Sequence, residues 1–388
     1  MQKDQRTTLY VSVGRELMHY DVDVDNGALI RRSPLTLPYN VQYVWPHPTG
    51  PFLYAVCSNG GPLARGDAHC AVALRMDEPS NALSVRGHPA PLPARPIHAS
   101  VDHAGKYLLT AYNDPSCVTV HRIDPDSSVG ARVKQRVEPE TGIYAHQVMV
   151  APSGKTVIVV VRGNDAKDSR PEDPGALKVF SYDDGQLSAI ATVAPNRGYG
   201  FGPRHLDFHP SKPWIYVSLE RQNTLQMYRM TSNSVELVPA YTKSTLADTV
   251  AMRRRQRPGP IHVHPNGRFV YVANRASGTA MIGDKPVFIG GENNIAVFEI
   301  DQRTGEPRAI QHEDTRGIVP RTFALDTSGR ILVAANSVPI LAQRSEIITA
   351  IIPSLSVFRV GNDGKLSYVR QYEIDVGKET MFWMGMVG

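Results

Sequence analysis

A unit of about 50 residues recurs along the chain and constrains its fold more than any other feature of the sequence. Each unit contains an alternating strand, a Pro-x-Gly-type turn and a strongly apolar strand, as in IHASVDHAGKYLLTAYN, HQVMVAPSGKTVIVVVR and IHVHPNGRFVYVANR. The turns are anchored at Gly50, Gly105, Gly154, Lys212, Gly267 and Gly329, between 49 and 62 residues apart. A period of this length is typical of one four-stranded blade of a β-propeller.

A second pair of strands follows each apolar strand, with hairpin signals such as Asp184-Gly185, Thr304-Gly305 and Asp363-Gly364. Six units are complete, and the N-terminal TLYVSVGRELMHYDVDVDNGALI supplies three strands of a seventh. We expect the C-terminal MFWMGMV to supply its missing innermost strand, because ring closure removes exposed sheet edges.

The sequence therefore predicts an all-β fold, a seven-bladed β-propeller of four-stranded antiparallel blades whose ring is closed by the C-terminal strand. Residues 1–388 are expected to form this single domain. Separate β-sandwich domains are the alternative. They would not explain a repeat that lacks its first strand at one terminus and finds it at the other.

The charge balance favours a small anionic ligand over nucleic acid. The chain has 42 basic and 37 acidic residues and a net charge of +5, and its one dense basic run spans residues 253–257. Most such runs are solvated, so we assign this one a supporting electrostatic role. Three cysteines, without zinc spacing, do not suit a disulfide framework. The absence of an apolar signal core or an apolar run of about 18 residues predicts a cytoplasmic protein that does not bind membranes.

Two sets of equivalent positions are expected to surround one mouth of the central channel. Residues equally far from a hairpin turn lie opposite one another, and the first strand of a blade is innermost. The positions eight residues before the anchors are Gln42, Ile97, His146, Arg204, Gly259 and Arg321. Those eight residues after the anchors are Ser58, Asn113, Arg162, Glu220, Arg275 and Ser337. Strand ends are often polar, but arginines, a histidine and a glutamate converging on one concavity favour a functional site.

Four long segments leave the blades at the same rim and are predicted to be irregular loops that shape this site. They cover residues 58–70, 163–174, 276–294 and 337–354. Segment 276–294 contains enough glycine to act as a mobile cover, and a surface segment without a role at the site is the equal alternative.

Three motifs indicate a family: GPRHLDFHP (202–210), the WIYVSLE that ends at Glu220, and the HPNGRFVYVANR that ends at Arg275. With them the chain resembles the lactonase family of seven-bladed propellers, which includes 6-phosphogluconolactonases and carboxymuconate lactonizing enzymes. The resemblance implies a lactonase acting on an anionic sugar lactone, with His146, Arg204, Glu220 and Arg275 as its active-site residues. From their repeat positions we add Arg321, Arg162 and Asn113 as substrate-binding candidates. No cofactor or metal is predicted, and a monomer or weak homo-oligomer is expected.

Lactone hydrolysis requires an activated water and a stabilised oxyanion. Glu220 or a neutral His146 could accept the proton of the water, and Arg204 and Arg275 could bind a carboxylate, a phosphate or the oxyanion. Strand alternation predicts that His205 points away from the channel. A metal-dependent site would need several carboxylates and amides, and Glu220 is the one obvious carboxylate of the ring, although Asn113, Asn274 and Asn336 could contribute amides.

Two other functions are compatible with the same sequence. The first is a lactonizing cycloisomerase, since adding a carboxylate to a double bond also needs a proton donor and arginines. The second is a non-catalytic interaction propeller, which is less favoured because WD-repeat signatures are absent.

Overall fold

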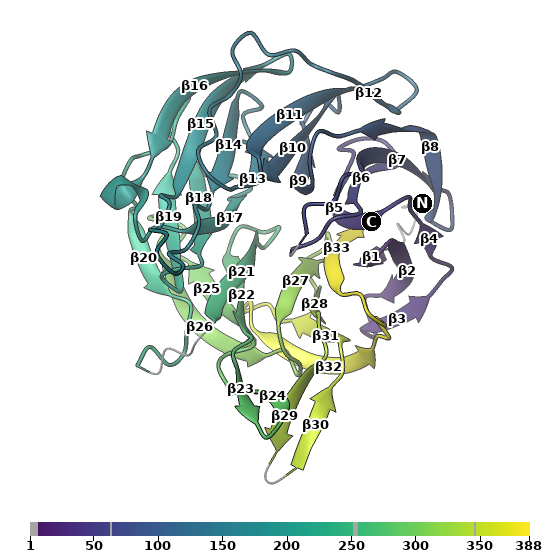
Figure 1. Ribbon diagram of the computed structural model, residues 1–388, viewed down its shortest axis with the longest axis vertical. Coiled ribbons are helices and arrows are strands. Elements are labelled where there is room, and N and C mark those ends of the chain that lie inside the picture. The colour runs from purple at the N-terminus through teal and green to yellow at the C-terminus, as the bar shows by residue number, and fades with distance from the viewer. Residues whose placement is uncertain (1–6, 63, 251–254, 345–346) are drawn as a thin grey trace.

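The computed structural model describes residues 7–62, 64–250, 255–344 and 347–388 and consists almost entirely of β-strands. Seven antiparallel sheets are arranged in a ring (Figure 1), so the predicted seven-bladed propeller is confirmed. Within these ranges the helical content is one 3-10 turn, Pro195–Gly198, and no helix is long and apolar enough to cross a membrane. The three cysteines, Cys57, Cys70 and Cys117, are free.

Each blade runs from an innermost to an outermost strand. The closing blade contains β33 (Met381–Val387), β1 (Thr8–Val13), β2 (Glu16–Asp23) and β3 (Ala28–Arg31), with β4 (Leu35–Thr36) also paired to β2. Next come β5 (Asn40–Pro46), β6 (Phe52–Ser58), β7 (His69–Asp77) and β8 (Ala82–Pro91), then β9 (Pro96–Val101), β10 (Tyr107–Asn113), β11 (Ser116–Ile123) and β12 (Val129–Arg132). The fourth blade contains β13 (Ala145–Val150), β14 (Thr156–Val161), β15 (Ala176–Asp183) and β16 (Gln186–Val193).

The remaining three blades follow the same order. They are β17 (Pro203–Phe208), β18 (Trp214–Leu219), β19 (Thr224–Arg229) and β20 (Tyr241–Ser244); β21 (Gln256–Val263), β22 (Phe269–Ala276), β25 (Asn294–Ile300) and β26 (Pro307–Asp314); and β27 (Pro320–Leu325), β28 (Ile331–Asn336), β31 (Ser354–Val360) and β32 (Leu366–Glu373).

The ring is closed by the C-terminal strand, as predicted. Strand β33 pairs antiparallel with β1, Thr8 lying opposite Val387 and Val11 opposite Met384. Both ends of the chain therefore belong to one sheet, and Figure 1 shows the N and C labels beside it.

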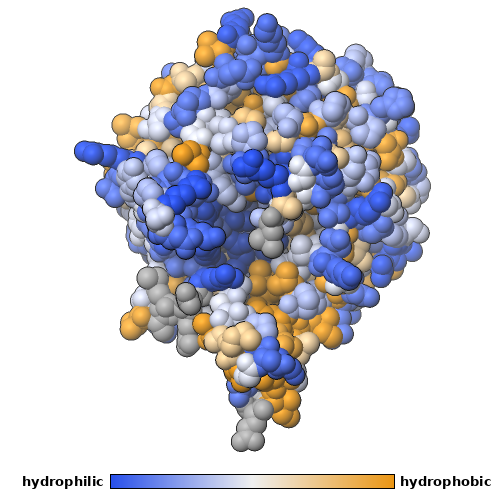
Figure 2. Space-filling view, in the orientation of Figure 1, coloured by the Kyte–Doolittle hydropathy of each residue, from blue (hydrophilic) through white to orange (hydrophobic). Residues whose placement is uncertain are grey.

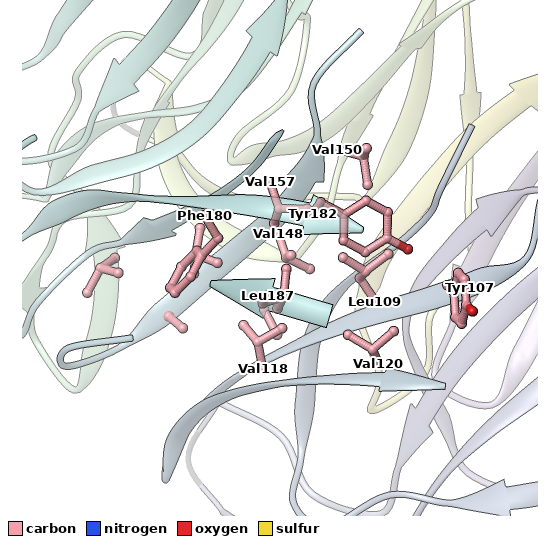
Figure 3. Close-up of a cluster of buried hydrophobic side chains, with 14 of the residues drawn as sticks. Tyr107, Leu109, Val118, Val120, Val148, Val150, Val157, Phe180, Tyr182 and Leu187 are labelled. Carbon is pink, nitrogen blue, oxygen red and sulfur yellow. The ribbon is translucent and has the colours of Figure 1, made fainter. Parts of the chain in front are cut away.

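The hydrophobic core is divided among the seven interfaces between neighbouring blades, each filled by its own apolar cluster. Figure 3 shows one of them, in which Val148 and Phe180 of one blade face Leu109 and Val120 of the preceding blade. Because a blade is covered on both faces, its second strand is apolar throughout rather than alternating. Every residue of β14, with the sequence TVIVVV, is buried.

A histidine beyond the first strand bonds to the anchor turn of the next blade, which explains the anchor glycines. The Nε2 atom of His264 lies 2.9 Å from the carbonyl oxygen of Gly329, and His209 makes the same contact with Gly267 at 2.8 Å. Gly329 has a φ of +72°, and a Cβ atom there would stand 2.3 Å from the His264 ring. Glycine is therefore required both by the turn and by the neighbouring ring.

Buried tyrosines connect the second strand of one blade to the outer hairpin of the next. The hydroxyl of Tyr271 donates to the carbonyl oxygen of Gly364 at 2.9 Å, and that of Tyr216 donates to Gly305 at 2.9 Å. The hairpin glycines that indicated the outer strands in the sequence are thus also points of contact between blades.

The prediction of irregular loops was wrong for segments 276–294 and 337–354. The first forms the hairpin of β23 (Thr279–Ile282) and β24 (Lys285–Phe288), and the second forms the hairpin of β29 (Ile340–Arg344) and β30 (Ile347–Ile351). Parallel pairing of β24 with β29 joins them into an eighth sheet, which projects from one edge of the ring in Figure 1. Gly283-Asp284 makes a two-residue hairpin turn, with φ of +63° at Gly283, and Val287 and Ala342 are buried where the hairpins meet.

The tyrosine contacts make a measurable contribution to stability. We predict that Tyr271→Phe lowers the free energy of unfolding by about 1 kcal/mol, because the carbonyl oxygen of Gly364 loses a buried donor. Urea denaturation followed by tryptophan fluorescence measures the change. The control is Tyr368→Phe, since that side chain is 40% exposed and its substitution should cost less than about 0.5 kcal/mol. Equal stability of the two variants would contradict the role given to the Tyr271 hydroxyl.

Candidate active site

Every innermost strand contains a β-bulge at the same level of the channel. In six strands the unpaired position is, or includes, the residue that lies eight positions before the anchor. These residues are Gln42, Ile97, His146, Arg204, Gly259 and Arg321, and in β33 the irregularity falls at Phe382 and Trp383. A bulge places two successive side chains on the same side of a strand. It therefore directs polar residues into the channel mouth from strands that are otherwise buried.

The bulge also overturns the prediction for His205. Pro203 pairs with Leu219 and His205 with Ser218, so Arg204 is the extra residue between them. Strict alternation therefore does not apply, and Arg204 and His205 both line the channel. The rings of His205 and His146 meet edge to face, with their centres 4.8 Å apart.

At the rim above, the carboxylate of Glu220 is held by three arginines. Oε1 accepts from Nη1 of Arg204 at 2.7 Å and from Nη2 of Arg275 at 2.5 Å, and Oε2 accepts from Nε of Arg162 at 2.5 Å. The Glu220 side chain is only 3% exposed, and the three arginine side chains are between 7% and 11% exposed. The four side chains come from three consecutive blades, and ring geometry alone brings them together.

The electrostatics of this cluster fix the charge of Glu220. Burial by itself would raise the pKa of the carboxyl group, but the charges of Arg204, Arg275 and Arg162 outweigh it and hold the pKa well below its usual range. Glu220 is therefore ionised at neutral pH, and both its oxygens are occupied by guanidinium donors.

A second carboxylate, Asp165, supports the arginines from the rim. Its oxygens accept from Arg162 at 2.9 Å, Arg221 at 3.0 Å and Arg257 at 2.8 Å. The sequence indicated segment 163–174 as a rim loop but not this residue. The feature of the sequence that could have identified Asp165 is its position three residues after Arg162. Arg257, from the basic run at 253–257, thus has a structural ion pair, whereas Arg253 and Arg254 lie outside the described residues.

These side chains line a rim cavity of about 1000 Å³. Figure 2 shows a hydrophilic hollow near the centre of the ring face. Eight cationic and three acidic side chains line the cavity: Arg162, Lys167, Arg170, Arg204, Arg255, Arg257, Arg275, Arg321, Asp165, Asp168 and Glu220. The excess of positive charge suits an anionic ligand.

Three of the arginines that line this cavity each have a buried Nε donor without an acceptor in the described ranges. The Nε atoms of Arg204, Arg275 and Arg321 are shielded from solvent, and none has an acceptor among the residues that the structure describes. Arg321 lies over the ring of Phe382, with its guanidinium carbon 3.8 Å from the ring centre. Burial, reinforced by the charge of Arg204, lowers the pKa of Arg275 to about 9 and that of Arg321 well below its usual value. An anion bound in the cavity would relieve the repulsion between these guanidinium groups.

His146 lines a smaller cavity of about 100 Å³ in the channel below. Its ring is parallel to that of Tyr144, with the centres 6.1 Å apart, and its buried Nδ1 has no partner within the described ranges. Burial, then the charge of Arg204, holds the pKa of His146 well below its usual value. The imidazole is therefore neutral at pH 7 and can accept a proton.

The other sequence candidates lie elsewhere. The Asn113 side chain lines neither cavity, and its amide oxygen accepts from Arg95 at 3.1 Å. Arg95, a buried residue that the repeat comparison missed, also bonds to Gln42 at 2.9 Å.

The amides of Asn274 and Asn336 donate to the backbone carbonyls of Thr245 and Thr315. In the part of the chain that the structure describes, no three His, Cys, Asp or Glu side chains are grouped so that they could hold a metal ion. The amide nitrogens of these two asparagines therefore support the backbone.

Comparisons with known proteins agree with this architecture. The family model "Lactonase, 7-bladed beta-propeller" matches residues 7–351. A 6-phosphogluconolactonase of Bacillus subtilis is 27% identical over 338 residues, which cover 84% of this chain and 86% of the relative. One of Yersinia pestis is 26% identical over 302 residues, 77% of this chain and 76% of the relative.

Among solved structures, the periplasmic gluconolactonase of Pseudomonas aeruginosa has a TM-score of 0.75 with this chain at 22% identity, over 99% of both chains. That similarity shows the same fold. The family match spans most of the chain and confirms what the three motifs indicated. The chain belongs to the lactonase family of seven-bladed β-propellers.

Proposed function

We propose that the protein is a lactonase that hydrolyses an anionic sugar lactone, such as a phosphorylated aldonolactone, in the rim cavity. The observation that carries this proposal is the convergence of the guanidinium groups of Arg204, Arg275 and Arg321 on one cavity whose lining has more cationic than acidic side chains. The relatives named 6-phosphogluconolactonase in Bacillus subtilis and Yersinia pestis support the same reaction class.

His146 is the proposed general base. It is neutral at pH 7, and it lines the channel directly below the arginines. It takes a proton from water as the water oxygen attacks the lactone carbonyl carbon, and the resulting oxyanion is stabilised by Arg204 and Arg275. The ring C–O bond then breaks, the imidazolium returns the proton to the leaving alkoxide, and the product is an open hydroxy acid.

Glu220 is the residue that positions the arginines, rather than the base. Its two oxygens already accept three guanidinium hydrogen bonds, so neither oxygen is free to take a proton from water. Its charge also offsets part of the repulsion among Arg162, Arg204 and Arg275. The arginines are thereby fixed before the substrate arrives.

Arg321 is the proposed anchor for the anionic group of the substrate. It makes no hydrogen bond or ion pair to any residue in the described ranges, whereas Arg162, Arg204 and Arg275 all bond to Glu220. An uncompensated, desolvated guanidinium gains most from a bidentate phosphate or carboxylate partner.

A hydrolysis screen tests the function. Phosphorylated and plain aldonolactones and a carboxymuconate are assayed with spontaneous opening subtracted, and we predict turnover of a phosphorylated aldonolactone. His146→Gln should lower kcat by about 10²- to 10⁴-fold, the usual contribution of a general base. The control His88→Gln alters an exposed residue of β8 and should keep the wild-type rate. Turnover of the carboxymuconate alone, or full activity of His146→Gln, would refute this mechanism.

The anchor role is tested by Arg321→Met. We predict that KM for the phosphorylated lactone rises about 10- to 100-fold, because a charge-assisted hydrogen bond contributes about 1.5–3 kcal/mol. KM for the uncharged lactone should change less than about threefold. Arg330→Met is the matched control, because Arg330 lies at an exposed anchor turn and its guanidinium pairs with Asp25. An equal rise for both lactones would show that Arg321 does not read the anionic group.

The positioning role is tested by Glu220→Gln. We predict a loss of about 3 kcal/mol in the free energy of unfolding at pH 7, because the variant leaves buried guanidinium charges without their counter-ion. Glu236→Gln removes an exposed carboxylate 3.8 Å from Arg229 and should cost less than about 1 kcal/mol. A Glu220→Gln variant as stable as wild type would contradict this role.

A further inference from the structure

The wall of the channel follows a regular order below the bulges. In β5, β13 and β17 the bulged residue, the next residue and the residue two further along line the same cavity. In β17 these are Arg204, His205 and Asp207, and in β13 they are His146, Gln147 and Met149. The channel therefore contains a level of side chains immediately below the arginines that the proposed chemistry does not use.

The imidazoles of His146 and His205 line the channel cavity, and that of His98 is buried outside its lining. Both ring nitrogens of His98 and the Nδ1 atom of His205 are buried and have no hydrogen-bond partner among the residues described. The ring centre of His205 lies 6.3 Å from that of His98 and 4.8 Å from that of His146. His205 thus shares a cavity with the proposed base on one side and contacts the buried His98 on the other.

Water is the ligand that suits the channel cavity lined by His146 and His205. A buried polar atom that no protein group satisfies is normally paired with water. The cavity volume of about 100 Å³ accommodates about three water molecules at about 30 Å³ each. Burial holds the pKa of His205 well below its usual value, so its ring is neutral and carries one donor and one acceptor nitrogen.

The two cavities approach the reacting centre from opposite sides. Arg275 and Glu220 line only the rim cavity, His146 and His205 line only the channel cavity, and Arg204 and Arg321 line both. A lactone whose anionic group is held by the arginines enters from the rim. The proposed base then faces the substrate from the channel side.

We infer that the channel supplies the attacking water and that His205 positions this water for His146, an inference that rests on the lactonase function proposed above. A water molecule that donates one hydrogen to His146 and accepts from or donates to His205 has its oxygen directed toward the arginine level. In the reaction its oxygen bonds to the carbonyl carbon and its proton passes to His146. After the ring C–O bond breaks and the hydroxy acid leaves, another water from the channel cavity takes its place. His205 acts through the water and is a positioning residue.

The test compares His205→Leu, His205→Gln and His121→Leu on the lactone that the wild-type protein turns over best. His205→Leu removes both polar atoms, and we predict that kcat falls at least tenfold while KM stays within about twofold, because the rim contacts are unchanged. His205→Gln restores polar atoms at a similar distance and should recover most of kcat. His121 is the matched control, since it is also a buried histidine with an unpartnered Nδ1 but lies on β11, outside both cavities.

Each outcome decides the inference. Wild-type kcat in His205→Leu, or an equal loss of kcat in His121→Leu, overturns it, as does a Gln variant no more active than the Leu variant. If His205→Leu does not fold, as judged by its thermal unfolding transition, His205→Met takes its place because the flexible side chain fits irregular space. A wild-type protein inactive on every lactone defeats the proposed function, whereas wild-type activity that survives in His205→Leu defeats only the channel inference.

Discussion

The candidate site depends on one backbone irregularity, the β-bulge that recurs at the same level in the innermost strands. A paired strand would present one side chain to the channel at this level and hide the next. The bulge presents both, so that Arg204 and His205 face the channel together. Because the bulges share a level, residues far apart in the chain converge without any loop having to fold over the site.

Charge balance then determines what the site can bind. Glu220 and Asp165 compensate Arg162, Arg204, Arg221, Arg257 and Arg275, but neither reaches Arg321, and three Nε donors are left over. Buried guanidinium groups without acceptors are costly. The interfaces between blades, each with its own apolar cluster, supply the stability that holds this arrangement rigid. An anionic substrate balances the positive charge that remains in the cluster.

The fold and part of the site could be predicted from sequence because a repeat makes distant positions comparable. Anchor glycines identified five blades, Lys212 identified a sixth, and the closing blade has no anchor of this kind. The residues eight positions before the anchors proved to be the bulged residues of the innermost strands. The bulge itself was not visible in the sequence, so the orientation of His205 was predicted wrongly. The contacts of Asp165 and Arg95 depend on loop paths that no period describes. The eighth sheet requires pairing between two insertions, each of which looked irregular alone.

The most direct test of the central claim is a crystal structure of the protein with the phosphorylated aldonic acid that lactone hydrolysis would produce. We expect the acid to occupy the rim cavity, with its phosphate on the Arg321 guanidinium and its carboxylate within hydrogen-bond distance of the guanidinium groups of Arg204 and Arg275. A water should lie between the new carboxylate and His146. An acid bound elsewhere on the propeller, away from these guanidinium groups, would contradict the account.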